Sequence, residues 1–529
     1  MACYRAAFAA AILFTGITLS ASAGRAQSSG TGCSPNGRVF NLQGPKNAVG
    51  QFNETVAVLP GAGAHGTDLV FGTALDARAL PPLGFLPGQD ADAFYVQRAN
   101  SACAADLEGE MPPIQSNTGD VYNIFGNPVV TADPARGAFF AADLRYSGQF
   151  AVGVMKATRA TLLNTSACPN GTEANPAACF VPVAQLANIV SLNSSSGLFS
   201  PSLSVDQRTA GTGAGDVYIA VAQNNADGTT ASISLSACAN TLRDCSRPMV
   251  ISGSDTRTSN PWVAVRPDGG VTVSYVEREA NTPVSAMDIR FVNCQPGGSP
   301  NAPTCTAPAP VIREPQPAGV PGEVLLSPQY VNPLELAAPD LTYPKHVDRL
   351  ESDGTTVTTF LVYDRCETSG ITGDEIFVPL CPKTDVVILS TTDGGATWSP
   401  AQKVSNASGQ QFFGNLALDA STGTVNIAYY STENDALKTA MQIFLAQVAP
   451  GETSPGAPVQ ITATLYDGPL GGFNGDEELP GSYLGIAAGG TGQPGQSRVY
   501  IHFSGSVTPG NYDGVLFPVA NDILTSLQY

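Results

Sequence analysis

The stretch Ser390-Thr-Thr-Asp393-Gly-Gly-Ala-Thr-Trp398 carries the clearest fold signal in the chain. A strand-like run at 385–390 leads into it and a second at 401–404 follows, so the stretch joins two β-strands. Asp393 can accept backbone N–H groups across the turn, and the two glycines permit positive φ angles. Trp398 is expected to pack its ring against the next structural unit. We therefore predict a β-hairpin whose turn is locked by its own side chains.

Short apolar strands recur along the whole chain. They begin at residues 56, 128, 201, 261, 346, 415 and 483, at intervals of 60 to 85 residues, and often follow Asn-Pro or Ser-Pro. A turn and then a β-branched or aromatic strand come after each of them. Four-stranded blades with generous loops fit this spacing, so we predict an all-β fold, a seven-bladed β-propeller, with six blades as the runner-up. A pair of β-sandwiches and a β-helix are the alternatives.

The repeat suggests a domain plan. We expect a signal peptide at 1–26, an N-terminal segment with a closing strand at 27–50, the propeller at 51–529 and a long interblade loop at 314–345. The expected blades lie near 51–117, 118–192, 197–253, 258–315, 345–405, 412–465 and 476–529. The outer strand of the last blade comes either from 37–42, which we favour, or from 523–529. Residues 435–448 have a helix-like apolar period, but their place in the repeat calls for a strand.

Composition and charge narrow the possible partners. The 43% hydrophobic and 13% charged content, with 55 glycines and 41 prolines, favours many short strands over long helices. The net charge is −19, and it becomes −21 when the two arginines of residues 1–26 are removed (−19 − 2). Such acidity argues against nucleic acid as a partner. A basic start and a short apolar run predict export to the periplasm or the medium, with no membrane span.

Ten of the eleven cysteines remain after the predicted signal peptide. In an exported protein they favour disulfides, which we pair as Cys33–Cys103, Cys168–Cys179, Cys238–Cys245, Cys294–Cys305 and Cys366–Cys381. Three of these pairs fall in loops between the third and fourth strands of a blade, so they staple one face. Cys366–Cys381 ties a loop on the opposite face. Metal binding by cysteine is the weaker interpretation, because the chain has no CxxC pair.

The unstapled face is the expected binding face, because several second strands end there with an acid and an arginine close together. Arginine forks suit carboxylates, sulfates and uronic acids, whereas inter-blade salt bridges are the competing explanation. The candidate ligand-binding residues are Arg78, Arg145, Arg278, Asp364, Arg365, Glu433, Asp476 and Tyr483.

Other side chains on this face have two interpretations each. The acidic loop 467–478 could bind a structural calcium, supply an acid or base, or be a solvated turn. Phe412 and Phe413, like Tyr483, could stack on sugar rings or cover the rim of the channel. The three histidines fall in different blades, so we do not expect a histidine metal centre. Apart from the structural calcium that the acidic loop could bind, we expect no cofactor.

The pattern [ST]-x-D-x-G-x-x-W at Thr391, Asp393, Gly395 and Trp398 resembles the Asp-box, or BNR repeat, of sialidase-like β-propellers. In that superfamily the box is structural, and the resemblance covers about residues 50–529. Sialidases use an arginine triad, a tyrosine nucleophile paired with a glutamate, and an aspartate acid/base. Their N-terminal Arg-Ile-Pro motif is missing here, where the region reads Arg38-Val-Phe, and 429–433 brings no arginine. We therefore carry over no catalytic residue.

These observations predict an exported sialidase-like propeller that recognises a glycan or another extracellular ligand, such as a protein, at its unstapled mouth. One alternative is a carbohydrate-active enzyme, a glycoside hydrolase or polysaccharide lyase, that uses mouth carboxylates such as Asp364, Glu433 and Asp476 with arginines. True sialidase activity is not expected. The other alternative is a surface or assembly protein with 314–345 as its contact loop.

Overall fold

The structure is a computed structural model, and it describes the residue ranges given below. The chain divides into two units, residues 1–31 and 32–529, and everything described lies in the second. The described residues are 38–40, 50–61, 68–77, 91–98, 107–111, 114–115, 119–148, 150–163, 181–182, 189–190, 198–225, 230–253, 256–279, 287–314, 320–321, 343–367, 380–381, 383–436, 440–462, 466–467, 484–490, 497–512 and 515–528.

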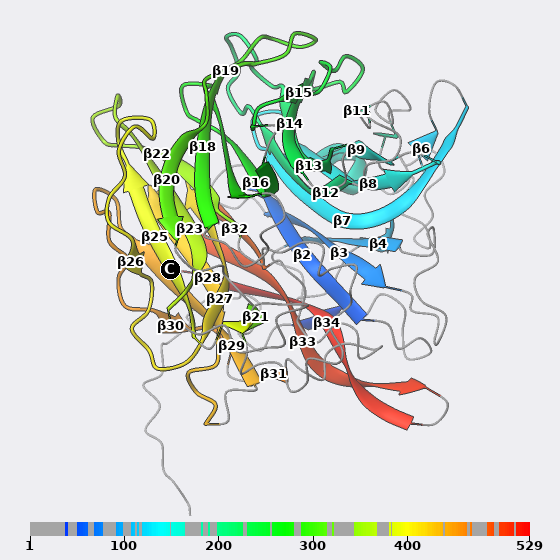
Figure 1. The fold of residues 1–529 in the computed structure, drawn as a ribbon. Helices are drawn as coiled ribbons and strands as arrows, with labels where there is room; N and C mark the ends of the chain where they lie inside the picture. Colours follow the sequence, from blue (N-terminus) through cyan, green and yellow to red (C-terminus); the bar gives the residue numbers. More distant parts are fainter. Residues whose placement is uncertain are drawn as a thin grey trace, which may run out of the picture. The chain divides into compact units, whose positions relative to one another are not determined.

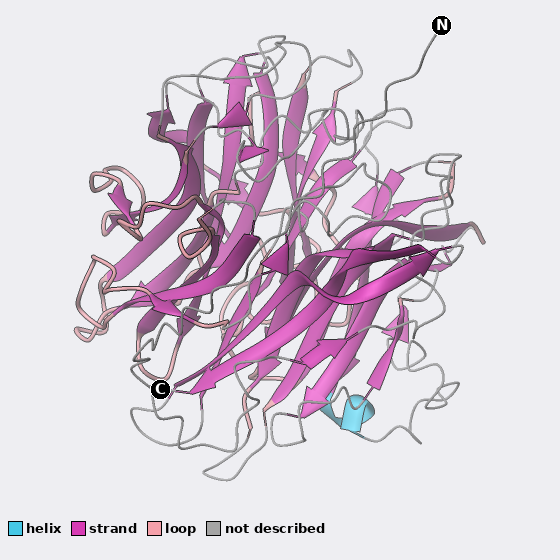
Figure 2. Cartoon of the chain, turned by 90° about the horizontal axis from the view of Figure 1, so that it is seen from below, coloured by secondary structure: helices cyan, strands magenta, loops and turns pink. Residues whose placement is uncertain are grey.

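Secondary structure in these ranges is almost entirely β, as Figure 2 shows. The one helix described, α1 (Arg159–Leu163), spans 5 residues. The all-β prediction is confirmed, and 440–448 is a strand despite its helix-like period. Within the described ranges no helix combines the length and apolarity needed to cross a bilayer.

The strands form successive groups that are antiparallel within each group, and most of them are labelled in Figure 1. The first three groups are β2 (Gly50–Leu59), β3 (Leu69–Ala77), β4 (Ala91–Arg98) and β5 (Leu107–Glu110); β6 (Ile114–Gln115), β7 (Val121–Asp133), β8 (Ala138–Tyr146), β9 (Phe150–Thr158), β10 (Val181–Pro182) and β11 (Ile189–Val190); and β12 (Leu198–Val205), β13 (Val217–Asn224), β14 (Ala231–Cys238) and β15 (Met249–Val250). Next come β16 (Thr256–Val265), β17 (Val271–Glu279), β18 (Met287–Gln295), β19 (Thr304–Cys305) and β20 (Ala309–Glu314); and β22 (Lys345–Leu350), β23 (Val357–Cys366), β25 (Thr384–Thr391) and β26 (Gln402–Lys403). The last groups are β27 (Gln411–Asp419), β28 (Thr424–Ser431), β29 (Ala440–Val448), β30 (Val459–Gln460) and β31 (Tyr466–Asp467); and β32 (Gly485–Gly490), β33 (Ser497–Tyr512), β34 (Val515–Gln528) and β1 (Arg38–Phe40). A single parallel bridge, Ala231 opposite Arg257, joins the group that begins with β12 to the group that begins with β16.

Two short connections complete this topology. β1 pairs with β34, with Arg38 opposite Leu524, so strands from both ends of the chain share the last sheet. β21 (Val320–Pro321) pairs in parallel with β24 (Leu380–Cys381). This pairing sets part of the predicted interblade loop beside the loop between β23 and β25.

The first long strands of consecutive groups lie next to one another. β2 contacts β7, β7 contacts β12, β12 contacts β16, β16 contacts β22, β22 contacts β27, β27 contacts β32, and β32 contacts β2. Apolar side chains fill the space between neighbouring groups, as where Phe71 of β3 meets Phe139 of β8 with ring centroids 5.3 Å apart. Because a sheet packed on both faces buries consecutive residues, strands such as β14 and β25 are buried along their whole length.

A bulge marks the start of several of these first strands. The pairing register shifts in β2, β7, β12, β16 and β27, and Asn127, Ser200, Asn260 and Phe413 adopt φ angles of 45° to 55° there. Ser200 Oγ donates to Asn260 Oδ1 at 3.1 Å, which links two neighbouring bulges. Left-handed backbone at residues other than glycine is strained and needs support from its surroundings. The Asn-Pro and Ser-Pro signals in the sequence therefore correspond to bulges.

The Asp-box turn has the predicted hydrogen bonds. Thr397 N–H donates to Asp393 Oδ1 at 3.0 Å, and Gly394 and Gly395 have φ angles of 72° and 89°. Hydrogen bonds from Thr397 and Thr391 hold the pKa of Asp393 well below its usual value. Trp398 differs from expectation: its ring meets Phe291 of β18 edge-on at 5.3 Å, so it packs against the preceding group, because the turn leans back toward that sheet.

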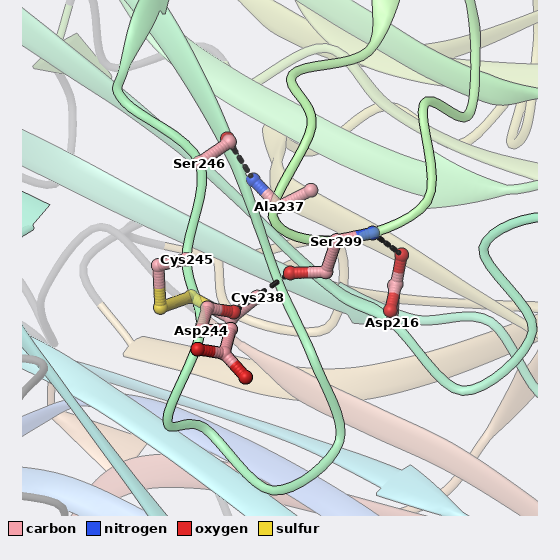
Figure 3. Close-up of a disulfide and its surroundings, with 7 residues drawn as sticks. All are labelled: Asp216, Ala237, Cys238, Asp244, Cys245, Ser246 and Ser299. Atoms are coloured by element: carbon pink, nitrogen blue, oxygen red, sulfur yellow. Dashed lines mark hydrogen bonds between the residues drawn. A yellow bond between two sulfur atoms is a disulfide. The ribbon is translucent and has the colours of Figure 1, made fainter.

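Two predicted disulfides are confirmed, Cys238–Cys245 and Cys294–Cys305. Each closes a loop after the third strand of its group, at what we call the disulfide end. Figure 3 shows that Ser299, in the second loop, connects to the first, because its hydroxyl donates to Asp244 O at 2.7 Å. Its N–H donates to Asp216, just before β13, at 2.9 Å. The side chains of the other six paired cysteines, Cys33, Cys103, Cys168, Cys179, Cys366 and Cys381, lie outside the described residues.

Candidate functional site

The opposite ends of the sheets, where the second strands β8, β17, β23 and β28 finish, are called the open end. Basic side chains gather there on two neighbouring groups, which begin with β16 and β22. We name these residues the basic cluster: Arg278, Arg290, Arg313, Lys345, Arg365, Lys383 and Lys403. They are seven of the 25 lysines and arginines in the chain. Carboxylates are interleaved with these cations, so the cluster is a network of ion pairs whose arginines and lysines differ in exposure.

On the β22 group the cations share carboxylates. Arg365 Nη2 lies 2.6 Å from Glu367, and Lys403 Nζ lies 2.6 Å from both Glu367 and Asp385. Although partial burial raises the pKa of Glu367, hydrogen bonds from Lys403 and Arg365 lower it to about 2. The side chains of Arg365 and Lys403 are 23% and 28% exposed, so a ligand can reach them.

The β16 group contributes a second network. Arg290 bonds Glu277 at 2.7 Å and Asp288 at 3.2 Å, and Arg313 reaches the same Asp288 at 3.4 Å. The side chain of Arg313 is 63% exposed, whereas Arg278, on β17, is 2% exposed. This half of the cluster therefore offers Arg313 and Arg290 to solvent.

A buried hydrogen bond joins the two halves. The hydroxyl of Tyr363 on β23 donates to Glu314 on β20. Burial, and then the charge of Glu314, raises the pKa of Tyr363 far above its usual value. Since a phenolate is disfavoured in this environment, Tyr363 is poorly suited to act as a nucleophile.

Lys345 is a buried member of the basic cluster and pairs electrostatically with the buried Asp364. Lys345 Nζ lies 5.8 Å from the ring centroid of Trp262 and 5.7 Å from that of Tyr343. The carboxylate of Asp364 accepts the N–H groups of Phe413 at 2.8 Å and Gly414 at 3.1 Å, at the bulge of β27. Burial lowers the pKa of Lys345 and raises that of Asp364, while their mutual attraction favours both charged forms. Asp364 thus holds the neighbouring group in place.

The predicted ligand-binding residues fall into three sets. Arg365 belongs to the exposed part of the cluster, and Glu433, half-buried on the next group, accepts a hydrogen bond from Ser431 at 3.0 Å. Arg145, Arg278 and Asp364 are buried. Arg78, Asp476 and Tyr483 lie outside the described residues, so the grouping of the carboxylates Asp364, Glu433 and Asp476 stays a prediction.

Arg145 shows why a buried arginine is a poor ligand contact. Its guanidinium bonds Asp143 on the same strand, and both side chains are fully buried. Phe412 and Phe413 are also buried, at 1% and 3% exposure, where they pack with Tyr430 in the core. Both rings therefore belong to the hydrophobic core, which leaves them unavailable as a sugar platform.

Several cluster residues gave no signal in the sequence. Lys345 begins a strand, Lys383 precedes one, and Lys403 lies beyond the Asp-box turn, so no local motif joins them. Strand pairing brings them near one another: Lys345 lies opposite Val362 of β23, and Lys403 lies opposite Val387 of β25. Among the described residues no group of three or more histidines, cysteines or acids is arranged to hold a metal ion. The structural calcium stays a prediction, because 468–478 is not described.

No protein-family model matches the chain. No curated protein matches it in sequence. Solved structures resemble it over most of its length. An ulvan lyase, a polysaccharide lyase, is 11% identical with a TM-score of 0.45, covering 92% of this chain and 96% of its own. A Hadza microbial sialidase is 10% identical with a TM-score of 0.40, covering 92% of each chain. An α-L-arabinofuranosidase from Fusarium graminearum is 9% identical with a TM-score of 0.37, covering 93% and 95%. TM-scores below 0.5 are too low to assign this chain to any of these proteins' families.

Proposed function

We propose that the chain is an exported, sialidase-like β-propeller of seven blades that recognises an anionic glycan at its open end. The blade count is supported by the contacts of the first strands, which pass from β2 through β7, β12, β16, β22 and β27 to β32 and back to β2. The Asp-box turn supports the sialidase-like assignment. The described disulfides and the sequence of residues 1–26 support export.

The basic cluster is the observation that carries the choice of ligand. Its partly exposed members already hold carboxylates in short pairs, such as Arg365 with Glu367, so their geometry suits the carboxylate of a uronic acid or a sulfate. A glycan anion would replace or share the internal partner. Because the chain as a whole is acidic, recognition of a polyanion would depend on these partly exposed arginines and lysines exchanging their internal carboxylates for those of the ligand.

Removing cations from the cluster tests this function. We expect Arg365→Ala with Lys403→Ala to weaken binding to dextran sulfate or polygalacturonate at least about tenfold, which corresponds to about 1.4 kcal/mol. Affinity electrophoresis in gels with and without each polymer measures the change, and the weakening should shrink as salt rises. Arg243→Ala, which removes an exposed arginine at the disulfide end, is the matched control and should leave binding unchanged.

Two results would contradict the proposal. One is a wild-type protein that migrates identically with and without both polyanions. The other is a double variant that binds as tightly as the wild type. If either polymer instead gains reducing ends or unsaturated products during incubation, the carbohydrate-active enzyme becomes the better description of the site.

A further inference from the structure

A second feature of the open end lies on the β6–β11 group, away from the basic cluster. Tyr146 ends β8 and is 36% exposed, which makes it one of few large apolar side chains exposed among the described residues. Phe150 begins β9 directly opposite Tyr146 in the strand register. Their ring centroids lie 5.0 Å apart with a 56° tilt between the planes. The two rings form one aromatic ledge at a hairpin tip.

The hydrophobic core and a neighbouring valine support the aromatic ledge. Phe150 is half-buried and packs against the hydrophobic core between this group and the β12 group. Val121 lies two residues before Asn123, the partner of Tyr146 on β7, so strand alternation directs it to the same side of the sheet. Val121 is 49% exposed. The surface therefore has a fixed aromatic centre and an apolar border.

We propose that Tyr146 and Phe150 form a stacking subsite for a single sugar ring, separate from the anion-binding cluster. This inference rests on the proposed function and adds a contact that is independent of charge. The apolar C–H face of a pyranose packs on aromatic rings, while its hydroxyls stay in water or meet a tyrosine hydroxyl. The second strands β8 and β23 finish at the same end of their sheets, so the subsite and the basic cluster both lie at the open end.

The size of the ledge favours a sugar over a protein. A stable protein interface buries about 800 Å² on each partner. One tyrosine, one half-buried phenylalanine and one valine offer far less than that, because a whole aromatic side chain buries about 150–250 Å². An isolated sugar ring matches the available area. The partly exposed hydroxyl-bearing ring also suits an amphipathic ligand better than a purely apolar one.

Substitution of the ring tests the subsite. Tyr146→Ala should weaken binding to polygalacturonate about fivefold in affinity electrophoresis, whereas Tyr146→Phe, which keeps the ring, should stay within about twofold of the wild type. The loss caused by Tyr146→Ala should persist at high salt, unlike the loss caused by Arg365→Ala. Val459→Ala removes an exposed apolar side chain on β30 and should have no effect.

The outcomes separate this inference from the proposed function. If Tyr146→Ala binds like the wild type while Arg365→Ala with Lys403→Ala binds weakly, the subsite is wrong and anion recognition stands. If Tyr146→Phe loses as much as Tyr146→Ala, the hydroxyl rather than the ring makes the contact, and stacking is overturned. If the wild type binds neither polygalacturonate nor dextran sulfate, both proposals fail.

Discussion

Asp364→Ala is expected to lower the free energy of unfolding by about 3 to 5 kcal/mol, which is typical of a buried charge left without its partner. The variant removes the acceptor of the Phe413 and Gly414 N–H groups at the β27 bulge. It also removes the carboxylate that attracts the buried ammonium of Lys345. Unsatisfied donors and an uncompensated charge then remain in the core between two groups of strands.

A mutant cycle separates these effects. We expect Lys345→Met alone to cost less than Asp364→Ala, because Asp364 keeps its two backbone donors. Lys345→Met combined with Asp364→Ala should recover part of the loss, since no buried ammonium is left. Urea midpoints at pH 7, followed by fluorescence and circular dichroism together, measure the series. A double variant less stable than the sum of the single variants would contradict the pairing.

Much of the fold is legible in the sequence because it repeats. The dipeptides Asn127-Pro128, Ser200-Pro201 and Asn260-Pro261 correspond to bulges at their first residues. The same dipeptide signal therefore marks the first strand of several groups. The cysteine spacing 238/245 and 294/305 matches hairpin loops that bring strands together. These features are local, and local patterns survive in a single sequence.

The site is harder to predict because strand pairing assembles it. An acid and an arginine two positions apart on a strand share one face, so they tend to bond each other, as Asp143 and Arg145 do. The sequence pattern therefore selects internal pairs as readily as ligand contacts. Arg365 differs from Arg145 because its partner Glu367 also bonds Lys403, which lies 36 residues further along the chain. Only the structure reveals that sharing.

The position of the Asp-box follows the same logic. Its hydrogen bonds lie within a few residues and were predicted, whereas the contact of Trp398 depends on which neighbouring sheet the turn meets. Phe291 of the preceding group supplies that contact, and Asn293 adds a hydrogen bond to Gly394 O at 2.7 Å. The disulfide end is therefore connected across groups by side chains. The open end is joined by Tyr363 and Glu314 as well, but it leaves Arg313, Arg365 and Lys403 at least partly exposed. This division of roles supports placing ligand recognition at the open end.

His346, next to Lys345 on β22, is expected to make the protein sensitive to acid. Its ring is fully buried, with Nε2 2.8 Å from Thr272 Oγ1 and Nδ1 2.7 Å from Ser274 Oγ. Burial lowers the pKa of His346 to about 3, from 6.5 in the unfolded chain. Because the folded value is the lower one, its stabilising contribution is complete above pH 6.5 and is lost as the pH falls toward 3. Between pH 6.5 and 4 the loss amounts to about 3 kcal/mol.

Asp348, on the same strand, works in the opposite direction. Burial raises its pKa to about 6 although Thr359 and Thr272 donate hydrogen bonds to it, so its contribution is complete below pH 3.8 and is lost as the pH rises through 6. Urea titrations from pH 7 to pH 4 should show His346→Gln losing less stability than the wild type on acidification, and Asp348→Asn losing more. Equal pH slopes for all three proteins would mean that neither group changes its proton affinity on folding. Opposite changes in the two variants would show that this buried network contributes two opposing proton-linked terms to stability, because one residue is held neutral as a base and the other is driven toward its neutral acid.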